Sequence, residues 1–206
     1  MGNEPLSPDL LLSLSKGPQL RRAAEIIRQR GIVAFPTETF YGLAVDPFDR
    51  RAVARLFSVK ERSPDKPVLV LVNNLDQLYR LVTEIPDLYQ PLMGRHWPGP
   101  LTLIFPAVAQ LPDLLTGNTG TVGVRISSHP LACALVEAVG GPVTATSANL
   151  SGQPAAGDVE EVRRQLGDRI DYLLDGGPTK GGSGSTIVGL AAGHLTLIRA
   201  GAVTFP

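Results

Sequence analysis

Several polar clusters interrupt the apolar runs of this sequence, and their residue types suit an anionic ligand. Lys60 and Arg62 stand two positions apart, and a further arginine, Arg125, ends a short apolar run. Lysine offers a mobile point charge to a phosphate, whereas arginine can form a bidentate fork on a carboxylate or a phosphate. Hydroxyl and amide side chains gather at 37–39 and 146–149. These groups together predict a binding site for a phosphate or carboxylate compound.

Each group also has a structural interpretation, and the residues alone leave both open. The Lys-x-Arg pair could complement a helix C-terminus, which is worth about 0.3–1 kcal/mol. Arg125 could be a surface residue of a strand, and Ser147 and Asn149 could be turn residues. For Glu38 a structural role is favoured over that of a general base. The glycine-dense stretch 176–185 is either a flexible turn or a loop whose amides and hydroxyls approach an anion.

Apolar periodicity predicts the elements that must position these groups. Helices are expected at 20–27, 53–60, 75–82, 88–92, 131–139 and 159–166. Strands are expected at 32–35, 68–72, 101–105, 122–126, 143–145, 172–174, 186–188 and 195–198. Some late strands follow one another directly, so the predicted fold class is α/β with a twisted mixed sheet and flanking helices. The polar clusters follow strands, where α/β sheets bind their ligands.

Composition narrows the classes of function. The chain has 206 residues, of which 43% are hydrophobic, and this suits one domain with its own core. Lys+Arg and Asp+Glu number 19 each, so the formal charge of zero argues against a protein that grips nucleic acid through a strongly basic surface. The single cysteine, Cys133, cannot form an internal disulfide. Neither a signal-peptide pattern nor a membrane-length apolar run occurs, so we expect a cytoplasmic protein without membrane contact.

Taken in order, the polar clusters resemble the motifs of one family, the YrdC-type threonylcarbamoyl-AMP synthases. The matching segments are Pro36-Thr-Glu-Thr-Phe-Tyr-Gly-Leu, Lys60-Glu-Arg, Trp97-Pro-Gly-Pro-Leu-Thr, Val122-Gly-Val-Arg-Ile, Thr146-Ser-Ala-Asn-Leu-Ser-Gly, Ser185-Thr-Ile-Val and Ile198-Arg-Ala-Gly. Each segment is weak alone, but the ordered set is highly specific. The resemblance implies one YrdC-like domain over 1–206, with a core at about 18–203, folded around a concave basic cleft.

The resemblance also implies an activity. L-threonine, bicarbonate and ATP would give threonylcarbamoyl-AMP and pyrophosphate, the first step of threonylcarbamoyladenosine formation at position 37 of tRNA. Mg²⁺ would arrive with ATP, with no protein ligand assigned to it and no tightly bound cofactor. The product would pass to a tRNA threonylcarbamoyl-transferase machinery, and any contact with RNA itself would be weak.

Roles for single residues follow from the family's motif positions. The characteristic catalytic set would be Lys60, Arg62, Ser147 and Asn149. ATP would be bound by Lys60, Arg62, Thr121, Ser147 and Arg199. Threonine would be bound by Thr37, Arg125 and Ala145. One departure concerns Leu71, which stands where relatives often carry a histidine on the threonine side of the site.

Two alternatives remain beside the synthase. The first is a paralogous YrdC-like nucleotide-binding protein of other specificity, a group that shares the Lys-x-Arg; the leucine at 71 favours it, whereas the Thr-Ser-Ala-Asn segment favours the synthase. The second is a non-catalytic RNA-binding module. The zero formal charge and an aromatic content of 5% disfavour that module, because RNA-binding surfaces combine basic and aromatic side chains.

Overall fold

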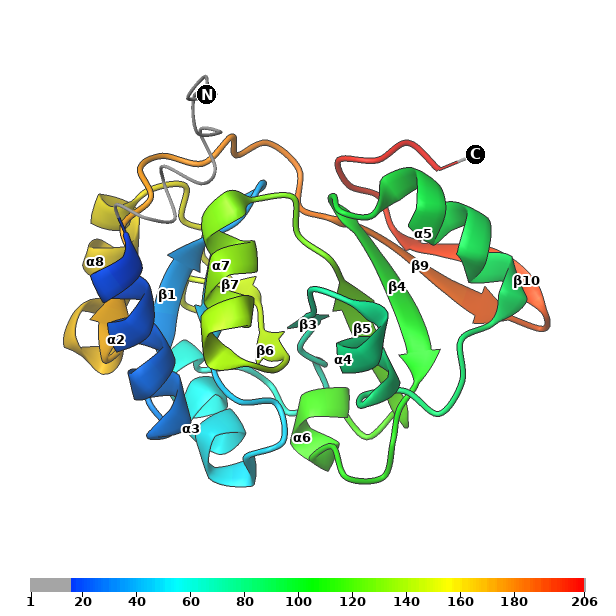
Figure 1. Ribbon diagram of the computed structural model, residues 1–206, viewed down its shortest axis with the longest axis horizontal. Helices are drawn as coiled ribbons and strands as arrows, with labels where there is room; N and C mark the ends of the chain where they lie inside the picture. Colours follow the sequence, from blue (N-terminus) through cyan, green and yellow to red (C-terminus); the bar gives the residue numbers. More distant parts are fainter. Residues whose placement is uncertain (1–15, 206) are drawn as a thin grey trace, which may run out of the picture.

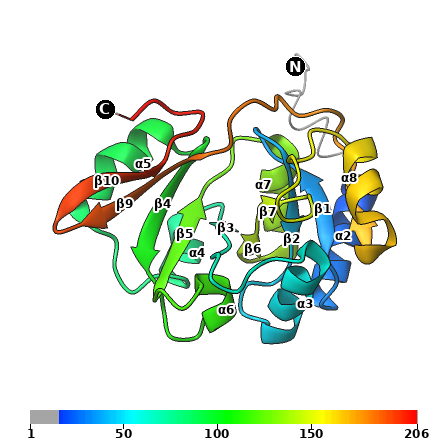
Figure 2. The same ribbon diagram turned by 180° about the vertical axis from the view of Figure 1, so that it is seen from behind.

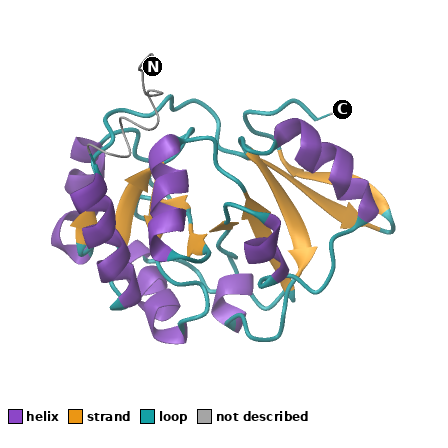
Figure 3. Ribbon diagram, in the orientation of Figure 1, coloured by secondary structure: helices purple, strands orange, loops and turns teal. Residues whose placement is uncertain are grey.

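The computed structural model describes residues 16–205, in which strands and helices alternate along the chain (Figures 1 and 3). The strands are β1 (Val33–Pro36), β2 (Tyr41–Ala44), β3 (Val70–Leu71), β4 (Leu101–Pro106), β5 (Thr121–Arg125), β6 (Val143–Thr144), β7 (Thr146–Ser147), β8 (Tyr172–Leu173), β9 (Thr186–Ala191) and β10 (His194–Arg199). The helices are α2 (Gly17–Arg28), α3 (Arg50–Lys60), α4 (Leu75–Tyr79), η1 (Asp87–Tyr89), α5 (Gln90–His96), α6 (Asp113–Thr116), α7 (Pro130–Val139), α8 (Val159–Leu166) and η2 (Gly167–Arg169). No helix of this described part is both long and apolar enough to cross a membrane.

The strands form two twisted sheets of mixed direction. One has the order β7-β2-β1-β8, and the other has the order β10-β9-β4-β5-β3-β6. In the first sheet β1 pairs antiparallel with β2 and parallel with β8. In the second sheet β4 pairs antiparallel with β5 and parallel with β9. The predicted class, α/β with mixed strand direction and flanking helices, is confirmed, but two sheets are present where the prediction had one.

Strand β1 is one of the two central strands of the four-stranded sheet, and all of its residues are buried. Val33 and Phe35 face a core shared with α2 and α7, whereas Ile32 and Ala34 belong to the larger core. Successive side chains of a strand point to opposite faces, so burial on both faces requires an unbroken apolar run. The strand therefore gives a rigid base to the turn at 37–40 that follows it.

The ends of helix α3 place the Lys-x-Arg pair. The helix begins at Asp49, whose side chain accepts hydrogen bonds from the amides of Arg51 and Ala52. It ends at Lys60, and the next residue, Glu61, has a left-handed backbone with φ 52°. This sharp turn directs Lys60 and Arg62 to different surroundings.

The chain passes between the two sheets three times within the described residues. The first passage, 45–69, contains α3, and the second is the single residue Ala145 between β6 and β7. The third passage, 174–185, connects β8 to β9 and runs over one edge of the molecule, as Figures 1 and 2 show in orange. We call these segments the three passages.

Several element boundaries differ from those predicted. The run 68–72 predicts a strand, but only its residues 70 and 71 pair as β3. The helix predicted for 75–82 ends at Tyr79, and Val82 instead forms an isolated bridge with Ala107. Strands β2 and β7 were not expected from the sequence. They form because each finds a partner in a distant segment, which apolar periodicity does not reveal.

Candidate functional site

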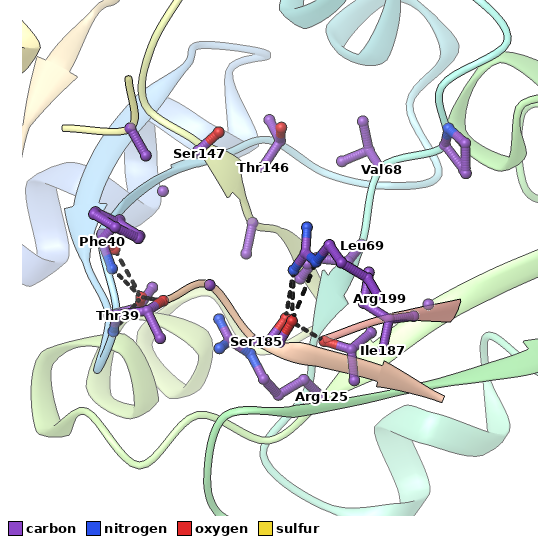
Figure 4. Close-up of a pocket in the computed structure, with 18 of the residues that line it drawn as sticks. Thr39, Phe40, Val68, Leu69, Arg125, Thr146, Ser147, Ser185, Ile187 and Arg199 are labelled. Atoms are coloured by element: carbon purple, nitrogen blue, oxygen red, sulfur yellow. Dashed lines mark hydrogen bonds between the residues drawn. The ribbon is translucent and has the colours of Figure 1, made fainter. Parts of the chain in front are cut away.

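A cavity of about 710 Å³ is lined by residues of both sheets and of the three passages (Figure 4). The first passage contributes Arg62 and Lys66 to its wall, the second contributes Ala145, and the third contributes Ser183 and Ser185. The volume lies in the range of pockets that hold small-molecule ligands. The cavity is therefore the candidate site, and segments far apart in the sequence build it.

The cavity wall contains some of the predicted site residues and not others. The predicted residues in the wall are Thr37, Arg62, Arg125, Ala145, Ser147 and Arg199. Those outside it are Lys60, Thr121 and Asn149. Thr121 begins β5, and its hydroxyl lies 2.8 Å from that of Thr119. A role for Thr121 in binding ATP stays a prediction, because the structure does not bring this residue into the wall.

Lys60 lies behind the wall and is bound to the loop that carries Ser147. The residue is only 1% exposed. Its Nζ donates hydrogen bonds to the backbone oxygen of Ser147 and to two oxygens of Asn149, the backbone oxygen at 2.7 Å and Oδ1 at 3.0 Å. An ammonium group has three donors, so all of them are used by this loop. Lys60 therefore holds the shape of the segment 147–149.

Burial gives Lys60 an unusual titration, from which a pH dependence follows. Burial, and next the charge of Arg62, lower the pKa of Lys60 from 10.5 to about 7. Between these two pH values the unfolded chain keeps a proton that the folded chain releases, so the free energy of unfolding rises with pH. Lys60 changes the free energy of unfolding by at most about 1.4 kcal/mol per pH unit. Urea unfolding of the wild type and Lys60→Met from about pH 6 to about pH 10 measures this contribution as the difference between the two proteins.

We expect that difference to move in favour of the wild type above about pH 7 and to stay constant below it. A difference that falls as the pH rises would mean that the three oxygen acceptors raise the pKa of Lys60 more than burial lowers it. That result would contradict the prediction.

Ser147 and Asn149 complete the hydrogen-bond network around Lys60. The hydroxyl of Ser147 donates to Asn149 Oδ1 at 2.6 Å, and Asn149 Nδ2 donates to the backbone oxygen of Gln153 at 2.6 Å. Ser147 lines the cavity, whereas the side chain of Asn149 is committed to the network behind the wall. Three of the four predicted catalytic residues are thus brought together, with Ser147 as their contact with the cavity.

Arg62, the fourth of that set, is held by its own loop. Its Nε donates to the backbone oxygen of Lys66 at 3.0 Å, and its Nη2 donates to that of Pro67 at 2.8 Å. The guanidinium also lies 5.9 Å from the ring centre of Phe57. Arg62 therefore fixes the loop 62–67, and its place in the wall leaves its charge next to the cavity.

Arg199 lines another part of the wall and bonds to the third passage, as Figure 4 shows. Its Nη2 donates to the backbone oxygen of Ser185 at 2.7 Å and to the hydroxyl of Ser185 at 3.1 Å. That hydroxyl lies 2.9 Å from the hydroxyl of Thr102 on β4. The end of the glycine-dense stretch is thus tied to β4 and β10, and this part of it is not a loose turn.

Arg125 is buried in the cavity wall and forms an ion pair with Glu38. The side chain is 3% exposed, and its Nη1 donates to Glu38 Oε1 at 2.6 Å. The interpretation of Arg125 as a surface residue is therefore wrong, whereas Glu38 has the structural partner that its favoured role requires. Burial lowers the pKa of Arg125, and the charge of Glu38 opposes this effect.

Thr37 lies in the wall, but its hydroxyl is occupied by its own turn. Its Oγ1 donates to the backbone oxygen of Phe40 at 2.7 Å and accepts from the amide of Thr39 at 3.2 Å. Such a side-chain bond to the backbone two or three residues on stabilises a tight turn. The turn presents Glu38 between β1 and β2.

The prediction did not assign roles to several residues that the structure brings to the site. Lys66, Phe40 and Thr102 line the cavity, and Ser127 donates a hydrogen bond to Glu38. The sequence held a signal for Thr102, since its hydroxyl interrupts the apolar run 101–105, and a polar group in a buried strand needs a partner. No such signal distinguishes Lys66 or Phe40, whose place depends on the folded loops.

Leu71 stands at the position where the resemblance leads us to expect a histidine. Leu71 is fully buried in the core with α2 and α7, and it is absent from the described cavity wall. The neighbouring wall residue of the same segment is Leu69. The departure at 71 therefore alters the packing behind the site and leaves the wall without an imidazole from this segment.

Comparison with known proteins adds relatives to this picture. The Sua5/YciO/YrdC family model, described as "Telomere recombination", matches residues 25–201. The threonylcarbamoyl-AMP synthase of Pyrococcus abyssi is 39% identical over 89% of this chain and 54% of its own length. That of Bacillus subtilis is 40% identical over 91% of this chain and 54% of its own length. The chain thus spans about half the length of these relatives, although it covers 88% of the Cellvibrio japonicus synthase, at 37% identity over 81% of this chain.

Solved structures agree with the sequence relatives. The P. abyssi Sua5 structure complexed with L-threonine superposes with a TM-score of 0.86 and 39% identity, covering 89% of this chain and 54% of that one. Escherichia coli YciO superposes with a TM-score of 0.80 and 27% identity, covering 89% of each chain. The matched residues include both sheets and the three passages that build the cavity wall. The chain therefore belongs to the Sua5/YciO/YrdC family.

Proposed function

We propose that this protein is a threonylcarbamoyl-AMP synthase, which converts L-threonine, bicarbonate and ATP to threonylcarbamoyl-AMP and pyrophosphate. The observation that carries the proposal is a single cavity with Arg62, Arg125 and Arg199 in its wall, each from a different part of the chain. The hydroxyls of Ser147 and Ser185 stand in the same wall. The relatives that are named as such synthases support it.

The reaction needs charge compensation more than a nucleophilic side chain. The threonine amine adds to bicarbonate and loses water, which gives a carbamate. A carbamate oxygen then attacks the α-phosphorus of ATP, the bond from that phosphorus to the bridging oxygen breaks, and pyrophosphate leaves. The carbamate and ATP are both anions, so the protein's task is to position them and to stabilise the charge that develops on the phosphoryl oxygens. A cavity lined by arginines fits this task.

The wall suggests where each substrate binds. We assign L-threonine to the part formed by Thr37, Arg125 and Ala145, where the arginine can receive the carboxylate. We assign ATP to the part formed by Arg62, Ser147 and Arg199. In this assignment Lys60 and Asn149 act through Ser147, since their polar atoms are committed to its loop.

Mg²⁺ would be brought by the nucleotide. The phosphates of ATP would be its ligands, as they are at other sites that transfer phosphoryl groups. The ion would neutralise charge on the phosphates.

The wider context of the reaction is also part of the proposal. We place the activity in a cytoplasmic protein, in one domain that surrounds a cleft of net positive potential. The product would be delivered to a tRNA threonylcarbamoyl-transferase machinery, and any contact with RNA would be weak. The wall supports the positive cleft, because it combines four cationic residues with one carboxylate, Asp65. Glu38, the carboxylate that pairs with Arg125, lies outside this wall.

Purified protein is expected to release pyrophosphate from ATP and Mg²⁺ only when bicarbonate and L-threonine are both present. Serine should support a slower reaction, because one methyl group is worth about 1–3 kcal/mol of discrimination. A coupled phosphate assay follows the release, and omission of each substrate is its control. Pyrophosphate release that ignores threonine would contradict the proposal.

A second candidate is a YciO-like protein that uses another substrate in place of threonine. It is favoured by the 27% identity with E. coli YciO over 89% of each chain and by Leu71. The same assay separates the two, since only the synthase depends on threonine.

A further inference from the structure

The Glu38–Arg125 ion pair joins the two sheets at the cavity. Glu38 lies in the turn between β1 and β2 of the four-stranded sheet, and Arg125 ends β5 of the six-stranded sheet. Their side chains are 9% and 3% exposed, and Arg125 Nη1 is 2.6 Å from Glu38 Oε1. A buried pair of this kind is sensitive to the loss of either partner, because the other is left as an uncompensated charge.

Glu38 is itself held from two sides. Its second oxygen, Oε2, accepts a hydrogen bond from the hydroxyl of Ser127, and that hydroxyl accepts in turn from the amide of His129 at 3.2 Å. The turn that carries Glu38 is fixed by the hydroxyl of Thr37. The carboxylate thus has little freedom to move, and its hydrogen bond with Arg125 fixes the orientation of the guanidinium.

Arg125 keeps hydrogen-bonding capacity that the protein does not use. Glu38 takes Nη1, while Nε is buried and has no hydrogen-bond partner among the described residues. A buried donor without a partner is costly. Nη2 also makes no hydrogen bond within the described residues and is not among the buried unpaired atoms, so it is the donor that a ligand oxygen in the cavity can reach. Arg199 also lies close enough for its charge to lower the pKa of Arg125, although burial is the larger cause.

We propose that Glu38 is a positioning residue for amino acid binding, which orients the guanidinium of Arg125 so that its remaining donors meet the substrate carboxylate. The inference rests on the proposed function, because it takes Arg125 as the carboxylate site. The orientation of the Arg125 guanidinium, and not only its positive charge, determines the affinity for the amino acid. Ser127 contributes by holding the carboxylate of Glu38 in place.

Two substitutions separate orientation from charge. Glu38→Ala removes both the contact and the charge, whereas Glu38→Gln keeps an oxygen that can accept from Arg125 Nη1 and an amide that can donate to the hydroxyl of Ser127. We expect Glu38→Ala to weaken threonine binding by about tenfold to a hundredfold, as a misplaced binding group does, with the KM for ATP changed by less than about threefold. Glu38→Gln should keep at least about one third of the wild-type affinity for threonine. The exposed Glu137→Gln is the matched control and should change neither value.

The measurements are calorimetric titration of L-threonine into the full chain and steady-state KM values for threonine and ATP. Unchanged threonine affinity in Glu38→Ala, an equal loss for both substrates, or a Glu38→Gln as impaired as Glu38→Ala would overturn the inference. If Glu38→Ala does not fold, Ser127→Ala removes only the second anchor, and a threonine affinity equal to that of the wild type would overturn it. A wild type that binds threonine but releases no pyrophosphate would refute the synthase and leave the titrations to decide on Glu38.

Discussion

Replacing Lys60 with methionine is expected to lower pyrophosphate release at least about a hundredfold, the loss typical of a disordered charge-stabilising site. Methionine keeps the length of the side chain but removes three hydrogen bonds to Ser147 and Asn149. The backbone oxygen of Ser147 keeps the amide of Asn149 and Asn149 Oδ1 keeps the hydroxyl of Ser147, whereas the backbone oxygen of Asn149 loses its donor. The lost hydrogen bonds and the one acceptor left without a donor also lower the free energy of unfolding, here by about 3 kcal/mol in total. A chain of this size should then lose about 6–12 °C in Tm. Initial rates and thermal unfolding at one pH measure the two effects.

Lys180→Met is the control, because this exposed lysine lies outside the cavity wall. Its rate and Tm should match those of the wild type. A Lys60→Met protein that keeps its Tm but loses activity would place Lys60 directly on a substrate and not behind the wall. A variant that keeps its full rate would contradict a functional role for the Lys60 network altogether.

Replacing Arg125 with lysine should raise the KM for threonine about a hundredfold while the KM for ATP changes little. Lysine retains the charge and can still approach Glu38, so the buried carboxylate keeps a partner. It lacks the planar fork that receives a carboxylate through two parallel hydrogen bonds. The separate KM values for the two substrates report this loss.

Arg163→Lys provides the matched control, since Arg163 is an exposed residue of α8 paired with Glu160. No kinetic constant should change there. If Arg125→Lys raised both KM values equally, the arginine would maintain the shape of the whole cavity. That result would contradict the assignment of the threonine carboxylate to Arg125.

Local patterns in the sequence predict much of this fold. Asp158 caps α8 through its hydrogen bond with the amide of Glu161, and Gly140 ends α7 with φ 77°, so α8 begins and α7 ends where the apolar periodicity predicts. These features depend on neighbours in the chain, which a sequence displays directly. Strand β2 could not be found in this way, because Tyr41–Ala44 lacks alternation and becomes a strand only between β1 and β7. The division into two sheets is equally a matter of distant pairing.

The site shows the same limit. Residue types and spacing single out Arg62, Arg125 and Ser147, and the structure places all three in one wall. They do not reveal that Lys60 turns away from this wall, because the direction depends on the left-handed residue at 61 and on acceptors almost ninety positions later. Nor do they pair Glu38 with Arg125, which belong to different sheets.

The three passages between the sheets have a mechanical consequence. Each one is both a connection between the two halves of the molecule and a part of the cavity wall. A rotation of one half against the other must therefore deform the cavity. A molecule that contacts all three passages would restrict the motion of the two halves against each other. Amide hydrogen exchange far from the cavity should therefore slow as the cavity becomes occupied.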